Sequence, residues 1–128
     1  MKVLIIEKDK TVRQSLSYFM ERHRNFEVFL AGSRKEGISL FQDIPFDIVL
    51  CEDRLPDGDG TETLKKLLKQ NPKLISILMT VHGDELSRQN AMRAGISGYL
   101  EKPFDLKQLE EIIIPSNPPL GKGAEGEF

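Results

Sequence analysis

The chain has 128 residues, 39% of them hydrophobic and 30% charged, which is the length and balance of one ordinary globular domain. Its formal net charge of -2 argues against direct nucleic-acid binding by this domain, and no apolar run is long enough to span a membrane. The single cysteine, Cys51, excludes an internal disulfide and is typical of a reducing, cytoplasmic compartment.

Five short apolar runs alternate with segments of helical period. Several runs are rich in β-branched residues and nearly continuous, as in strands buried on both faces of a parallel sheet. They cover residues 3–6, 26–31, 48–51 and 74–79, with a weaker run at 99–100.

The segments between the runs carry helix start and stop signals. The expected N-caps are Asp9, Ser33, Asp84 and Asp105. Pro72 is expected to end the third helix and Gly95 the fourth. This alternation predicts a single doubly wound α/β domain with a parallel sheet and right-handed crossovers.

The last stretch of the chain differs in composition from the rest. Residues 115–128 include three prolines and three glycines, and their only large apolar residues are Leu120 and Phe128. This composition predicts a linker or a disordered tail after a domain that covers residues 1–114.

Polar residues follow four of the apolar runs at the point where each run ends. Glu7 and Lys8 follow the first run, Glu52 the third, Thr80 the fourth and Lys102 the last. Because ligands bind at the carboxyl ends of strands in such sheets, we expect a site there. Each residue alone would indicate only a solvated charge or a helix cap, but their coincidence at four matching strand ends favours a functional site.

These motifs resemble the receiver domain of two-component response regulators over roughly residues 2–114. The matching segments are residues 3–9, 47–60, 77–80 and 94–104. The loop at 54–60 and the Lys102-Pro103-Phe104 ending look most like receivers of transcriptional activators with a central ATPase domain. The resemblance implies a flavodoxin-like fold with strand order 2-1-3-4-5, no enzymatic activity, and protein partners such as a sensor kinase or an output domain.

In the family, an aspartate four residues before the loop proline accepts a phosphoryl group from a histidine kinase. Acidic residues after the first strand help this aspartate to hold Mg²⁺. A Thr or Ser and a Lys contact the phosphoryl group, and an aromatic residue in the fifth strand changes rotamer. The resemblance assigns these last three roles to Thr80, Lys102 and Tyr99.

Two positions depart from the family's pattern. Glu52 stands at the phosphoacceptor position, and Lys8 replaces a metal-binding acid beside Glu7. The charges of Glu7, Glu52, Lys8 and Lys102 therefore sum to near zero, whereas a net charge of about minus two suits a hard divalent cation. One unit-charge contact at about 4 Å is worth roughly 4 kcal/mol at an effective dielectric near 20. We therefore expect no cofactor and weak or absent Mg²⁺ binding, with Glu7 and Glu52 as ligands if any binds.

The same substitutions predict new contacts inside the pocket. We expect the Lys8 ammonium to replace the metal between Glu7 and Glu52. Glu52 is expected to reach toward Thr80 and Lys102 as an imperfect mimic of the phosphorylated state. A rescue by phosphorylation of the adjacent Asp53 is the minor alternative, since strand alternation turns Asp53 away from the direction of Glu52.

Three functions are compatible with the sequence. The first is a receiver-like interaction module, independent of aspartyl phosphorylation, with a possible homodimer through the fourth helix, fifth strand and fifth helix. The second is an ordinary phospho-accepting receiver that regulates transcription and tolerates the substitutions. The third is a flavodoxin-like enzyme or nucleotide binder, which ranks low because residues 7–10 are not a Gly-rich phosphate loop.

Overall fold

Strands and helices alternate along the computed structural model, which describes residues 1–22 and 25–113. The predicted linker at residues 115–128 lies outside the described residues. The helices are α1 (Lys10–Glu21), α2 (Arg34–Asp43), α3 (Gly60–Gln70), α4 (Glu85–Arg93) and α5 (Leu106–Ile113). The strands are β1 (Lys2–Ile6), β2 (Glu27–Ala31), β3 (Ile48–Glu52), β4 (Arg54–Leu55), β5 (Gly58–Asp59), β6 (Ile75–Thr80) and β7 (Gly98–Glu101).

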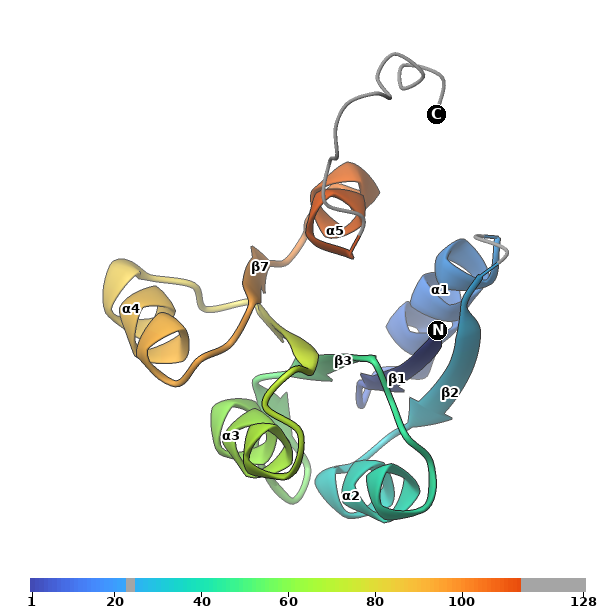
Figure 1. Cartoon of the computed structure of the whole chain (residues 1–128). Coiled ribbons are helices and arrows are strands. Elements are labelled where there is room, and N and C mark those ends of the chain that lie inside the picture. The colour runs from blue at the N-terminus through green and yellow to red at the C-terminus, as the bar shows by residue number, and fades with distance from the viewer. Residues whose placement is uncertain (23–24, 114–128) are drawn as a thin grey trace, which may run out of the picture.

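Five of these strands form one parallel sheet in the order β2-β1-β3-β6-β7. Counted along the chain, the five strands have the order 2-1-3-4-5, which confirms the doubly wound sheet. Figure 1 shows α1 and α5 on one face of this sheet and α2, α3 and α4 on the other. The order reverses next to β1, so the carboxyl ends of β1 and β3 flank the point where such sheets bind ligands.

The sheet is held between two apolar layers. All five residues of β3 are buried, and its side chains alternate between the layers. Val49 and Cys51 pack with α3 residues, whereas Ile48 and Leu50 pack with α1 and α5 residues. Full burial of a Leu or Ile side chain contributes roughly 1.5–3 kcal/mol, so the strand that ends at Glu52 has a rigid foundation.

The helix starts follow the predicted capping chemistry. The side chains of Asp9, Ser33 and Asp84 accept backbone N–H groups at the starts of α1, α2 and α4, which confirms these three caps. Asp59 caps α3 in the same way, a cap that was not predicted from the sequence. Gly95 follows α4 with a φ of 88°, a left-handed conformation that glycine adopts at helix ends.

A small antiparallel hairpin of β4 and β5 follows β3 and was not predicted. At its tip, the Asp57 carboxylate accepts the backbone N–H groups of Arg34 and Lys35 at 2.8 and 2.9 Å. These bonds lower the pKa of Asp57 and tie the hairpin to the start of α2.

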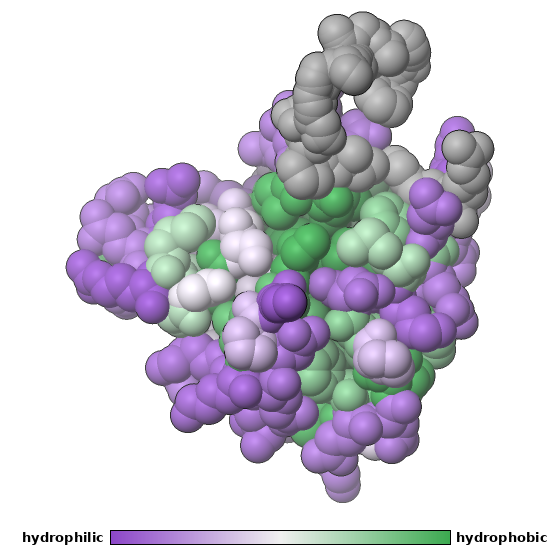
Figure 2. All heavy atoms as spheres, viewed as in Figure 1, coloured by the Kyte–Doolittle hydropathy of each residue, from purple (hydrophilic) through white to green (hydrophobic). Residues whose placement is uncertain are grey.

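The surface viewed in Figure 2 is mostly polar, with apolar residues gathered around α5. Exposed apolar side chains include Leu86 and Met92 of α4 and Leu106 of α5. None of the helices in the described ranges is both long and apolar enough to cross a membrane.

Candidate functional site

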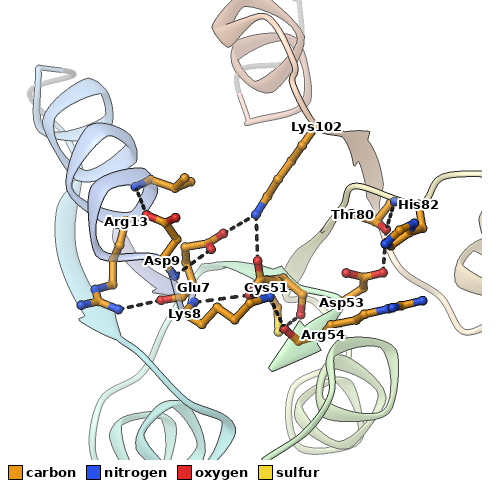
Figure 3. A network of polar contacts seen from close by, with 12 residues as sticks. Glu7, Lys8, Asp9, Arg13, Cys51, Asp53, Arg54, Thr80, His82 and Lys102 are labelled. Carbon is orange, nitrogen blue, oxygen red and sulfur yellow. Dashed lines mark hydrogen bonds and ion pairs between the residues drawn. The ribbon is translucent and has the colours of Figure 1, made fainter. Parts of the chain in front are cut away.

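The carboxyl ends of β1, β3 and β7 meet at one lysine (Figure 3). Lys102, directly after β7, donates from Nζ to Glu7 Oε1 at 2.7 Å and to Glu52 Oε1 at 2.8 Å. Glu7 directly follows β1 and is fully buried, and Glu52 is the last residue of β3. The Lys102 side chain is only 15% exposed, so one nearly buried ammonium joins two buried carboxylates.

Lys8 reaches the same pocket from its solvent side. Its Nζ donates to Glu52 Oε2 at 3.0 Å and to the Arg54 carbonyl oxygen at 2.9 Å, while its side chain stays 49% exposed. The prediction that Lys8 bridges Glu7 and Glu52 was therefore wrong, because the bridging ammonium belongs to Lys102. Neighbouring residues of an extended chain point in opposite directions, so Lys8 leans toward the start of the hairpin and Glu7 does not.

The second oxygen of Glu7 is also in use. Oε2 accepts the backbone N–H of Asp9 at 3.1 Å, and Arg13 Nη1 donates to the Glu7 carbonyl oxygen at 2.7 Å. These contacts lock the turn from β1 into α1 around a carboxyl group that has no access to water.

The three central ionisable groups are shifted in different directions. Burial raises the pKa of Glu7 despite the opposing bond from Lys102. Burial alone would also raise the pKa of Glu52, but hydrogen bonds from Lys102 and Lys8 bring it below its ordinary value. Burial would lower the pKa of Lys102, but its bonds to Glu52 and Glu7 raise it instead. Glu52 and Lys102 are thus a charged pair at neutral pH.

Thr80, at the end of β6, does not contact the lysine network through its hydroxyl. The buried Thr80 Oγ1 donates to Asp53 Oδ2 at 2.6 Å and accepts the His82 backbone N–H at 2.9 Å. The expected approach of Glu52 to Thr80 was wrong, because both Glu52 oxygens are held by lysines. Asp53 and Glu52 have separate partners, in line with strand alternation.

Tyr99 lies in β7 opposite Leu78 and is half-buried. Its hydroxyl oxygen is buried and has no hydrogen-bond partner among the residues that the structure describes. The peptide between Lys102 and Pro103 is cis.

The residues of the pocket do not fit a divalent metal ion. Mg²⁺ takes carboxylate and carbonyl oxygens as ligands, and the Lys8 ammonium already occupies one of each, on Glu52 and Arg54. Within residues 1–22 and 25–113, no group of three or more His, Cys, Asp or Glu side chains is arranged to hold a metal. Cys51 beneath the pocket is a buried free thiol, and burial raises its pKa.

The fold and these motifs define a signalling receiver, and comparison with known proteins agrees. The chain belongs to the response regulator receiver domain family, whose model matches residues 3–114. This membership confirms the resemblance drawn from the strand-end motifs and confirms the fold class.

Individual relatives are similar over nearly the whole receiver. Regulatory protein AtoC of Escherichia coli K12 is 33% identical over 112 residues, and transcriptional regulatory protein CrdR of Helicobacter pylori is 34% identical over 115 residues. Each match covers 88% of this chain, which spans only 24% of AtoC and 53% of CrdR. A solved CheY-like receiver from Methanospirillum hungatei JF-1 superposes with a TM-score of 0.81 at 28% identity, covering 88% of this chain and 89% of that one.

Proposed function

We propose that this receiver regulates its protein partners without accepting a phosphoryl group on Glu52 or on an aspartate. The observation that carries the proposal is the state of the Glu52 carboxylate, whose two oxygens each contact a lysine ammonium at 2.8 and 3.0 Å. A carboxylate engaged on both oxygens is a poor nucleophile toward a phosphoryl donor. Its charge is already compensated inside the protein.

The position of Lys8 supports the same proposal. Phosphoryl transfer is catalysed mainly by positioning and by a divalent cation that neutralises the developing charge. The Lys8 ammonium lies between a carboxylate and a carbonyl oxygen, where such a cation would find ligands. A divalent ion would have to displace this ammonium or approach it at close range, and both cost electrostatic free energy.

The proposed output is contact with another protein through α4, β7 and α5. This face carries exposed apolar side chains on two helices, including Leu86 and Leu106. Its occupant would be an output domain, a sensor kinase or a second copy of the chain, with no direct nucleic-acid contact and a cytoplasmic setting. Relatives that this chain matches over part of their length are named transcriptional regulatory proteins, so the regulated process is proposed to be transcription.

The direct test is intact-mass spectrometry after incubation with acetyl phosphate, with and without Mg²⁺. The proposal predicts an unchanged mass in both samples. A double variant, Lys8→Asp with Glu52→Asp, is the matched positive control, because it restores both family residues. A Mg²⁺-dependent mass gain in the wild-type protein would reject the proposal. Peptide mapping would then show whether Asp53 carries the added group.

A further inference from the structure

The hydroxyl of Thr80 both donates and accepts a hydrogen bond. Its single proton goes to Asp53 Oδ2 at 2.6 Å, the length of a charge-assisted O–H···O⁻ bond. Its oxygen accepts the N–H of His82 at 2.9 Å. Thr80 is also held through its backbone, since its carbonyl oxygen accepts the N–H of Lys102 at 2.6 Å. The loop after β6 is therefore anchored at Thr80, the last residue of the strand.

Asp53 is itself fixed from both sides. Its backbone N–H donates to the Met79 carbonyl at 2.8 Å, and its own carbonyl accepts the Gly60 N–H at 2.7 Å. A Cβ on Gly60 would overlap the backbone of Glu52 and Asp53, so the glycine permits this close approach. The Asp53 carboxylate is thus aimed at the end of β6 by a rigid backbone.

We propose that Asp53 is the positioning residue that holds Thr80, so that an internal carboxylate sets the conformation of the loop from Thr80 to Asp84 in front of α4. The inference rests on the proposed function, because a phosphoryl group on residue 52 would compete for the same hydroxyl. It differs from a mimic built on Glu52, whose oxygens both face lysines. Figure 3 shows Asp53 next to Thr80 and His82.

The buried hydroxyl of Tyr99 is a second sign that this region is held in one conformation. A buried hydroxyl without a partner costs roughly 1–3 kcal/mol relative to a hydrated one. The Tyr99 hydroxyl is in that state among the described residues, so rotation of the ring toward water would regain hydrogen bonds. The buried position is therefore maintained by its surroundings. Tyr99 lies in β7 opposite Leu78, two residues before Thr80 on the paired strand β6.

The test compares Asp53→Ala with Asp57→Ala, which removes a nearby carboxylate that does not contact Thr80. Hydrogen exchange followed by nuclear magnetic resonance reports on the His82 amide. We expect exchange about ten-fold faster in Asp53→Ala, from loss of one charge-assisted hydrogen bond, and no change in Asp57→Ala. Thr80→Ser keeps the hydroxyl and is expected to exchange like the wild type.

Labelling with 3-fluorotyrosine gives an independent readout, because Tyr18 and Tyr99 are the only tyrosines. Tyr18 is 67% exposed and serves as the internal reference for a solvated ring. In Asp53→Ala, the solvent isotope shift of the Tyr99 fluorine should move toward that of Tyr18. Unchanged His82 exchange together with an unchanged Tyr99 signal would overturn the inference.

The acetyl phosphate assay on the wild type separates this inference from the proposed function. A mass gain mapped away from residue 53, with the Asp53→Ala effects intact, would reject the proposed function and support the positioning of Thr80 by Asp53. If the wild type gains no mass and Asp53→Ala has no effect, only the positioning role of Asp53 would be rejected. A mass gain mapped to Asp53 would reject both.

Discussion

Replacing Lys102 by methionine removes the ammonium that Glu7 and Glu52 share while keeping an aliphatic side chain. Both Nζ–O contacts are short, at 2.7 and 2.8 Å, and Glu7 is fully buried. Removal of one partner from a buried ion pair typically costs about 3–5 kcal/mol. Because Lys102 keeps some exposure and Glu52 keeps Lys8, we expect the lower end, about 3 kcal/mol at pH 7. Urea unfolding followed by circular dichroism measures it, since the chain has no tryptophan.

The stability that Lys102 contributes should depend on pH in a defined direction. The pKa of Lys102 is raised in the folded protein, so its contribution is complete below the ordinary value of 10.5 and is lost as the pH rises through the raised value. In Lys102→Met, protonation of Glu7 removes the unpaired buried charge. The destabilisation should therefore shrink as the pH falls from 7 into the carboxyl range.

Lys2→Met is the matched control for this substitution. Lys2 pairs with Glu27 at the same 2.7 Å, but the two side chains are 36% and 62% exposed. Exposed pairs are worth about 1 kcal/mol or less, so this variant should lose correspondingly little stability. If Lys102→Met lowers the free energy of unfolding no more than Lys2→Met does, the buried ion pairs of Lys102 do not stabilise the fold as predicted.

Two substitutions and one alkylation experiment each test a single feature of the structure. Asp57→Ala should lower the urea midpoint of unfolding at pH 7. The difference in midpoint from the wild type should vanish as the pH falls below 3.8 through the lowered pKa of this carboxyl. A difference in midpoint that persists in acid would contradict this prediction. Burial raises the pKa of the Cys51 thiol, so iodoacetamide should alkylate it only as fast as the domain unfolds, and rapid alkylation of the native protein would be the opposite result. Gly60→Ala should cost about 1–3 kcal/mol or more in urea unfolding, because the added Cβ overlaps the Glu52 carbonyl oxygen.

The architecture was predictable because local signals and the sheet agree. Continuous apolar runs such as residues 48–51 are typical of strands covered on both faces, and the caps at Asp9, Ser33 and Asp84 stand where the helical period begins. The hairpin of β4 and β5 was missed because strands of two residues have no period to detect. Its anchor, Asp57, bonds to α2 more than 20 residues earlier in the chain.

The position of these residues at one edge of the sheet was predictable from the sequence, but the contacts between their side chains were not. Strand ends on one edge bring Glu7, Glu52 and Lys102 together whatever their side chains do, and the structure shows all three in contact. Which lysine bridges the acids depends on side-chain direction, and so does the choice of Asp53 over Glu52 as the partner of Thr80. Sequence position alone does not carry that information. The one available signal was an acid placed directly after β3, beside the end of β6.

Under the proposed function, lysine ammonium groups take the place of a metal ion beside Glu7 and Glu52. Isothermal calorimetry of Mg²⁺ binding, on the wild type and on Lys8→Asp with Glu52→Asp, tests it most directly. The double substitution changes the formal charge of the four pocket residues from zero to about minus two, the balance that suits a divalent cation. We expect no binding heat from the wild type at millimolar Mg²⁺ and clear binding by the double variant. Equal Mg²⁺ affinity in the two proteins would show that the lysine ammonium groups do not take the place of a metal ion.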